Sequence, residues 1–236
     1  MNCYDTLIKK ILFKLDAEFA HHLSLQLLKL AYHLKLSCFF SPSPVSPQQL
    51  MGLSFPNSVG LAAGFDKNGD YIDALALLGF GFIEVGTVTP KPQFGNPKPR
   101  IFRIANKKAI INRLGFNNKG CDYVVERLKQ RKFAGILGVN IGKNSETPLD
   151  DAISDYLAVF QKVAPFASYI TVNISSPNTK GLRDLQNPDF LPLLLNALKK
   201  EQATQKNYVP LVVKIAPDLT SAELQTIAEI FFSDTD

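Results

Sequence analysis

The chain has 236 residues, of which 46% are hydrophobic and 20% are charged, and its formal net charge is +5. This composition provides a sizeable apolar core and excludes a globally disordered chain or a coiled coil, and no apolar run approaches the roughly 18 residues of a membrane-spanning helix. The three cysteines are far apart, which excludes a disulfide framework and a zinc cluster and indicates a reducing compartment.

The first 36 residues predict two amphipathic helices over residues 5–36, because apolar side chains recur there every three or four positions. Lysines occupy the polar faces of these helices. Packing of the apolar stripe against the rest of the protein is the commoner arrangement, and a basic helix lying in a membrane interface is the alternative. Residues 41–47 are rich in serine and proline and predict a linker that separates residues 1–40 from the remainder.

Five short apolar runs of strand length follow this linker. Stretches of helical pattern separate them, with predicted starts at Pro148, at Pro188 and at a capping box formed by Thr220 and Glu223. Near-continuous apolar strands that alternate with helices indicate a parallel sheet covered by helices. The fold class is therefore α/β, either a doubly wound sheet or a (β/α)8 barrel. The predicted strands are 59–63, 82–87, 136–141, 169–174 and 211–215.

Several common chemistries are excluded. All histidines lie in the first 33 residues, which excludes a Ser-His-Asp triad and a histidine-ligated metal elsewhere. Glu84 stands where a dinucleotide-binding fingerprint beginning at Gly79 needs its third glycine, and Asn144 follows Gly142 and Lys143 where a P-loop needs serine or threonine. There is also no G-x-S-x-G elbow. The common nucleotide-binding and hydrolase functions are therefore not predicted.

Polar side chains stand at or just past the carboxyl ends of four predicted strands, among them Lys67, Asn140, Asn173 and Lys214. One buried polar residue in a strand is usually a satisfied structural group, but several at the same end of parallel strands indicate a site. Asparagine amides match the donor and acceptor edges of a planar heterocycle, and lysine matches a carboxylate or an electron-rich ring. No carboxylate pair is present, and no metal is expected.

Five sequence segments now carry a resemblance to a known family. They are GFDKN at 64–68, INRLGFNNKG at 111–120, VNIGKN at 139–144, NISSPNTKGLR at 173–183 and KIAPDL at 214–219. Together they resemble dihydroorotate dehydrogenase. Ser176 stands where the soluble class has cysteine, and residues 16–21 are similar to the Asp-Pro-Glu-x-Ala-His pattern of the membrane-associated, quinone-dependent class, except that Ala17 replaces proline.

The resemblance implies oxidation of (S)-dihydroorotate to orotate in pyrimidine biosynthesis, with FMN as cofactor. Ser176 would take the proton from C5 while the C6 hydride passes to flavin N5. The flavin-binding positions implied are Ala63, Gly64, Phe65, Asp66, Lys67, Thr87, Asn140, Asn173 and Lys214. The substrate-binding positions implied are Lys67, Asn112, Arg113, Leu114, Gly115, Phe116, Asn173 and Asn178.

The resemblance also implies that electrons pass to a membrane quinone. Residues 1–40 would form a module that binds peripherally to the cytoplasmic face of the inner membrane, with Arg103 near the quinone entrance. The segment 88–118 has seven basic and no acidic residues, which is typical of a solvated loop or of a surface that meets anionic lipid, nucleic acid or a charged small molecule. The resemblance implies no nucleic-acid partner.

A (β/α)8 barrel needs eight units, whereas residues 48–236 supply five recognisable strands, and residues 90–116 predict an inserted hairpin. We therefore expect an incomplete barrel of about five units, from a fragment or an early stop, which binds little FMN and lacks activity alone. Two other functions remain open: another FMN barrel acting on a pyrimidine, and a non-catalytic membrane- or anion-binding protein.

Overall fold

The computed structural model describes residues 9–36 and 45–233. Two helices form the amino-terminal region, α1 (Lys9–Leu12) and α2 (Ala17–His33). The side chain of Asp16 caps α2 by accepting hydrogen bonds from the backbone N–H groups of Glu18 and Phe19, at 3.0 and 2.9 Å. The prediction of two helices is confirmed within these residues; residues 5–8 and most of the predicted linker lie outside them.

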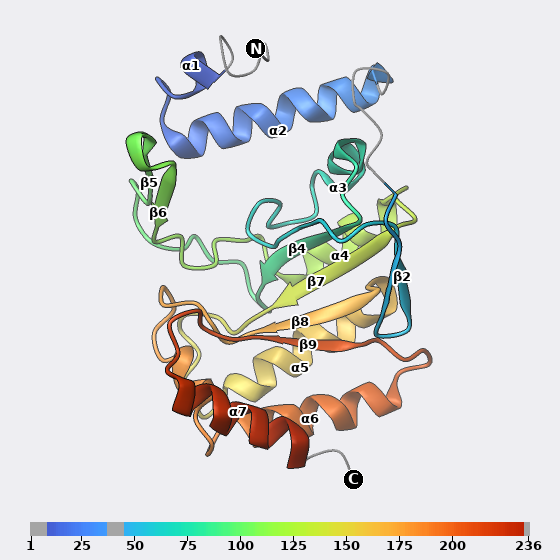
Figure 1. Cartoon of the computed structure of the whole chain (residues 1–236), viewed down its shortest axis with the longest axis vertical. Coiled ribbons are helices and arrows are strands. Elements are labelled where there is room, and N and C mark those ends of the chain that lie inside the picture. The colour runs from blue at the N-terminus through green and yellow to red at the C-terminus, as the bar shows by residue number, and fades with distance from the viewer. Residues whose placement is uncertain (1–8, 37–44, 234–236) are drawn as a thin grey trace.

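A five-stranded parallel sheet forms the centre of the molecule, with strand order β3-β4-β7-β8-β9 (Figure 1). The prediction of a parallel α/β sheet is confirmed, and each predicted strand matches an observed one to within two residues at either end. The described residues form no closed barrel. The strands are β3 (Gly60–Leu61), β4 (Phe82–Val88), β7 (Ile136–Ile141), β8 (Tyr169–Asn173) and β9 (Leu211–Lys214).

One face of the sheet carries the main hydrophobic core. Alternate strand residues such as Val85, Val139 and Val172 are fully buried there against the helices that connect the strands. The α-helices are α3 (Ile72–Leu75), α4 (Cys121–Gln130), α5 (Ala152–Val163), α6 (Leu191–Thr204) and α7 (Ser221–Ser233). The 3₁₀ helices are η3 (Ala76–Leu78), η4 (Ala105–Lys107), η5 (Ala164–Phe166) and η6 (Arg183–Gln186).

Two antiparallel hairpins lie at opposite ends of the strands. The first, β1 (Gln48–Leu50) and β2 (Leu53–Phe55), was not predicted; it packs Phe55 edge-on against Phe82 at the amino ends of the strands. The second, β5 (Ile101–Ile104) and β6 (Ala109–Asn112), confirms the predicted inserted hairpin. It lies beside α2 (Figure 1).

Two predicted helix starts are wrong, and one is confirmed. Helix α5 begins at Ala152 instead of Pro148, because the hydroxyl of Thr147 donates to the Asp155 carboxylate at 2.8 Å and residues 148–151 form a turn. Helix α6 begins at Leu191 instead of Pro188. The capping box before α7 is present: the Glu223 carboxylate accepts from the backbone N–H of Thr220 at 2.7 Å.

Candidate active site

A network of polar side chains crosses the carboxyl half of the sheet on the face away from the helices. Asn140 is fully buried and Asn173 is 5% exposed. The Asn140 carbonyl oxygen accepts from the Thr87 hydroxyl at 2.7 Å and from the Asn173 amide at 3.1 Å. The structure therefore brings together three of the predicted flavin-binding residues, from three neighbouring strands.

Thr87 reaches this network because β4 is irregular. The register between β4 and β7 shifts between Val85 and Val88, as in a β-bulge, which re-aims a side chain. Gly86 has φ +120°, and a Cβ there would collide with the backbone carbonyl oxygen of Asn140. Glycine at this position therefore lets the strand deviate and place the Thr87 hydroxyl beside both amides.

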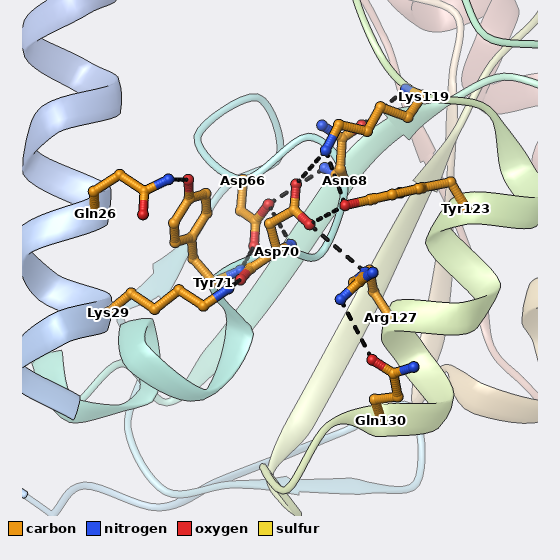
Figure 2. Close-up of polar contacts among 10 residues, drawn as sticks. All are labelled: Gln26, Lys29, Asp66, Asn68, Asp70, Tyr71, Lys119, Tyr123, Arg127 and Gln130. Atoms are coloured by element: carbon orange, nitrogen blue, oxygen red, sulfur yellow. Dashed lines mark hydrogen bonds and ion pairs between the residues drawn. The ribbon is translucent and has the colours of Figure 1, made fainter. Parts of the chain in front are cut away.

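The loop after β3 is folded around the carboxylate of Asp66, which is 2% exposed. It accepts hydrogen bonds from the backbone N–H groups of Asn68, Asp70 and Tyr71, at 2.7 to 3.3 Å (Figure 2). Burial raises the pKa of this carboxyl group, and the three N–H donors oppose the shift. The side chain of Asp66 thus shapes the loop, and any contact with a flavin would come from its backbone.

Lys67 follows Asp66 in the same loop, and its amine donates to the carbonyl oxygen of Gly64 at 2.7 Å. Burial lowers the pKa of this lysine, since the charged amine is poorly solvated. Gly64 is joined to the end of β4 by a hydrogen bond from its N–H to the Gly86 carbonyl, at 2.8 Å. Ala63 is half-buried beside it. The Lys67 amine is therefore linked, through Gly64, to the end of β4 that carries Thr87.

Asp70 anchors this loop to α4. Its carboxylate accepts from the hydroxyl of Tyr123 at 2.6 Å and from the amine of Lys119 at 3.2 Å, and Arg127 lies 3.7 Å away (Figure 2). On the opposite side, Lys29 of α2 donates to the Asp70 carbonyl at 3.2 Å. The loop that carries Lys67 is therefore held between α2 and α4.

Predicted substrate-binding residues approach from the second hairpin and from the loop after β8. The amide of Asn178 donates to the carbonyl oxygen of Asn112 at 3.5 Å, which joins these two segments. Phe116 is half-buried, and its ring lies against the position that a Cβ on Gly142 would occupy, at the end of β7. Gly115 is buried beside it and its carbonyl accepts from Gln93.

Arg113 and Leu114, two more of the predicted substrate-binding residues, are hydrogen-bonded to residues 96–99. The guanidinium of Arg113 donates twice to the carbonyl oxygen of Pro99, at 3.0 and 3.2 Å, so this side chain closes the base of the hairpin. The Leu114 carbonyl accepts from the backbone of Asn96. Lys214 was expected among buried strand residues but is exposed, because β9 is an edge of the described sheet.

Ser176 lies half-buried in the loop that follows β8. Its hydroxyl oxygen accepts from the backbone N–H of Asn178 at 3.2 Å. Thr179, three residues on, is 4% exposed, and its hydroxyl is buried without a hydrogen-bond partner. Sequence reasoning missed Thr179; its position next to Ser176 in an Asn- and Ser-rich loop was the available signal.

The amino-terminal helix contacts the site directly. The His21 ring is hydrogen-bonded to the carbonyl oxygen of Phe65 at 2.9 Å and meets the Phe65 ring edge-on. Burial, with the charge of Lys67 nearby, lowers the pKa of His21. A cavity of about 280 Å³ lies between α2 and the loop, lined by His21, Phe65, Lys67 and Ile101 among others.

Glu18 and Arg100 join α2 to the second hairpin. The two side chains are nearly buried and form a bidentate pair, with distances of 2.6 and 3.1 Å. The guanidinium of Arg100 holds the pKa of the Glu18 carboxyl below its usual range. Arg103 donates to the carbonyl oxygens of Leu12 and Leu15. The expected quinone-facing arginine is thus bound to the segment between α1 and α2.

These residues fit a planar flavin ring. Amide and hydroxyl groups converge at the strand ends, a lysine amine is adjacent, and a Cβ on Gly64 would meet no atom within 4 Å. Ring carbonyl and N–H groups of a flavin match this set of donors and acceptors, which offers no cluster of carboxylates or imidazoles. The chemistry of the site therefore agrees with the cofactor that the sequence resemblance implies.

Residues 46–235 match the sequence profile of the family described as dihydroorotate dehydrogenase. The chain belongs to this family. It is 59% identical over 229 residues to dihydroorotate dehydrogenase (quinone) from Acinetobacter baylyi, covering 95% of this chain and 68% of that protein. A protein of the same name from Neisseria meningitidis is 56% identical over 228 residues, again covering 95% and 68%.

Solved structures agree with this assignment. The structure of DHODH from Eimeria tenella in complex with ferulenol has a TM-score of 0.80 and 41% identity, covering 92% of this chain and 63% of that one. The ligand-free structure from the same organism has a TM-score of 0.82. The open sheet is thus part of a TIM-type barrel in a family of flavin enzymes, and the chain spans 63% to 68% of the length of these relatives.

Proposed function

We propose that the chain acts as a quinone-linked dihydroorotate dehydrogenase, which oxidises (S)-dihydroorotate to orotate in pyrimidine biosynthesis, in place of the inactive fragment expected from the number of strands. The observation that carries this proposal is the convergence of the Thr87–Asn140–Asn173 network, Lys67 and the Ser176 loop at one end of the strands. FMN, when bound, would supply an acceptor for the hydride that leaves C6 of the substrate. Ala63, Gly64, Phe65, Thr87, Asn140, Asn173 and Lys214 would hold it, with the loop shaped by Asp66.

Lys67 would bind the substrate carboxylate through a charge-assisted hydrogen bond, exchanging its contact with the Gly64 carbonyl for the ligand. Asn112, Asn173 and Asn178 would bind the amide edges of the dihydropyrimidine ring, because each amide offers both a donor and an acceptor. Gly115 and Phe116 would complete the pocket. The backbones of Arg113 and Leu114 would support it, since the Arg113 side chain is directed to Pro99.

Ser176 would act as the general base that removes the proton from C5. An unassisted serine is a poor base, so the proton must pass onward from its hydroxyl oxygen. The buried hydroxyl of Thr179, which lacks a partner, is suited to hold a water or the Ser176 hydroxyl in such a relay. The half-buried position of Ser176 limits competing access of water.

The acceptor side of the reaction would lie under α2. The cavity between α2 and the Lys67 loop would provide a path for a quinone ring beside His21 and Phe65. Arg103 holds the segment that leads from α1 into α2. Residues 1–40 would dock on the cytoplasmic face of the inner membrane as a peripheral module. Within residues 9–36, the exposed large apolar side chains are Ile11, Phe13, Phe19, Leu27, Leu30 and Leu34.

Membrane binding of this kind is interfacial. No helix in the described residues is long and apolar enough to cross a bilayer. Lysines at positions 9, 10 and 14 lie close to the exposed apolar side chains of α1, a combination that favours anionic lipid headgroups above an apolar interior. Nucleic acid is not proposed as a partner, because phosphate binding alone would not require the asparagine network.

The test is anaerobic mixing of the FMN-loaded protein with dihydroorotate, followed by addition of a short-chain quinone. We expect bleaching of the oxidised flavin spectrum by dihydroorotate and its return with the quinone. Bleaching by dihydropyrimidines that lack the carboxylate, and not by dihydroorotate, would favour another FMN barrel acting on a pyrimidine. Absence of FMN binding would contradict the proposal for this chain.

A further inference from the structure

Glu84 is a carboxylate inside the sheet, on β4, that the proposed reaction does not use. It accepts three hydrogen bonds: from the Asn140 amide at 2.8 Å, from the Thr171 hydroxyl at 2.9 Å and from the Tyr169 hydroxyl at 3.0 Å. Among the described residues no cation forms an ion pair with this half-buried carboxylate, and burying a carboxylate without one costs free energy that its three hydrogen bonds must offset.

The strand register is built to make these contacts. Glu84, Gly138 and Tyr169 lie in one row across β4, β7 and β8. Neighbouring strands are about 4.8 Å apart, so Tyr169 can reach Glu84 only by crossing β7. A Cβ on Gly138 would collide with the Tyr169 ring. Glycine in the middle strand therefore opens the way for a hydrogen bond between residues two strands apart.

An ionised carboxylate can only accept hydrogen bonds, so each group that is hydrogen-bonded to it must be the donor. The Asn140 amide must turn its NH2 group toward Glu84, which leaves its carbonyl oxygen to accept from Thr87 and Asn173. Asn173 must then use its NH2 group there, and its own carbonyl oxygen accepts from the N–H and hydroxyl of Ser175, at 3.1 and 2.9 Å.

We infer that Glu84 is a positioning residue that sets the orientation of the Asn140 amide, at the opposite end of the Asn140–Asn173 pair from the Ser175 N–H that fixes Asn173. The inference rests on the proposed function in one respect: these amides are the groups that would hold FMN and substrate. Without the Glu84 acceptor, the NH2 group of Asn140 loses its partner and the orientation of this amide is set by Thr87 and Asn173 alone, whereas the backbone N–H of Ser175 still fixes Asn173.

Three variants distinguish the role of Glu84 as a hydrogen-bond acceptor from the effects of its charge and of its size. Glu84→Met keeps the length of the side chain but removes the acceptor. Glu84→Gln removes the charge yet retains a carbonyl oxygen for Asn140, while the hydroxyls of Tyr169 and Thr171 can rotate to accept from its NH2 group. Thr171→Val is the matched control, because it deletes a donor to Glu84 without touching Asn140.

The experiment has two readouts on the full chain, side-chain amide NMR signals of asparagine and the dissociation constant of FMN from its fluorescence. For Glu84→Met we expect displaced or doubled Asn140 signals and FMN binding weakened at least about tenfold, which corresponds to about 1.4 kcal/mol. Glu84→Gln and Thr171→Val should stay within about threefold of the original chain, with single signals for both amides.

Two results would overturn the inference: unchanged asparagine signals in Glu84→Met, or a Glu84→Gln variant as impaired as Glu84→Met, since charge and not direction would then matter. The NMR readout does not depend on FMN. If the original chain failed to bind FMN while Glu84→Met still displaced or doubled the Asn140 signals, the proposed function would fail and the positioning role would stand.

Discussion

The strand-end site and the face formed by α2 and the β5–β6 hairpin are held by different forces. At the strand ends, neutral amides and hydroxyls from β4, β7 and β8 share short hydrogen bonds inside a close-packed sheet. At the α2 face, a charged pair, Glu18 and Arg100, joins elements that otherwise expose apolar side chains. The strand-end site depends on the direction of its hydrogen bonds, whereas the α2 face depends on an ion pair and on apolar contacts.

This difference matches two kinds of task. A directional network suits recognition of a planar ring, because each amide must present a donor or an acceptor at a defined place. A charged clasp with exposed apolar residues suits a surface that meets lipid and admits a hydrophobic acceptor. The loop of Lys67 lies between the two regions, bonded to β4 through Gly64 and to α2 through Phe65 and Asp70.

The largest expected effect comes from a variant at the strand-end site. Ser176→Ala should slow flavin reduction by dihydroorotate by about 10²–10⁴-fold, because the general base is lost, while FMN content stays the same. Stopped-flow measurement of the FMN-loaded protein checks this. Reduction at the original rate would assign the proton transfer to another group, and lost FMN would mean that Ser176 is structural.

The second prediction concerns the ion pair that joins α2 to the β5–β6 hairpin. Glu18→Ala should lower the free energy of unfolding by about 3 kcal/mol, because Arg100 is left buried without its partner. Glu126→Ala is the control, since its pair with Lys129 is exposed and should contribute less than about 1 kcal/mol. Denaturant titration of both variants compares them, and equal losses would contradict a clasp role.

The same pair predicts a pH dependence. The pKa of Glu18 is lower in the folded protein than its ordinary value of 4.5, so folding favours the ionised form. Its contribution to stability should be complete above about that ordinary value and disappear as the pH falls through the lowered pKa. The stability difference between the original chain and Glu18→Gln should therefore shrink on acidification; a constant difference would argue against it.

The third prediction concerns the loop between the two regions. Lys67→Met should raise KM for dihydroorotate by roughly tenfold or more, since a hydrogen bond to a charged group is lost, with a smaller effect on kcat. Because burial lowers the pKa of Lys67 below the ordinary 10.5, substrate affinity should decline with rising pH before an ordinary lysine would titrate. Lys180→Met, at an exposed position in the loop after β8, should change neither quantity.

The smallest expected effect concerns the exposed apolar side chains of α2 and their proposed binding to lipid. Leu27 and Leu30 are 55% and 54% exposed, so replacing both with serine should leave the fold intact. Binding to phosphatidylglycerol-containing vesicles should weaken by about tenfold, as expected for partial loss of apolar burial. Leu193→Ser is the control: it is 58% exposed but lies on α6, at the far end of the molecule (Figure 1).

Much of the fold follows from periodicity. The run Ile136–Ile141 was predicted to the residue, because a fully buried parallel strand is apolar without interruption. The starts of α5 and α6 were not, because Pro148 and Pro188 lie in turns set by tertiary contacts such as the Thr147–Asp155 hydrogen bond. The β1–β2 hairpin also escaped prediction, since its burial depends on Phe82 and Tyr169, far away in sequence.

The site was predictable where a residue stands at a strand end, as with Asn140 and Asn173. The site was not predictable where a residue's interaction partner lies far away in the sequence. Glu84 appeared only as a failed dinucleotide motif, although a carboxylate in an apolar strand was a usable signal. Lys214 was expected to be buried, but exposure depends on whether a strand has a neighbour, which a single strand sequence does not encode.

The central claim is that electrons enter at the strand ends and leave under α2. The direct test compares Ser176→Ala with His21→Ala in anaerobic stopped-flow mixing of FMN-loaded protein, first with dihydroorotate and then with quinone. We predict that Ser176→Ala slows only the first half-reaction and His21→Ala chiefly the second, because His21 borders the cavity beside Phe65. Equal loss of both half-reactions in His21→Ala would contradict the account.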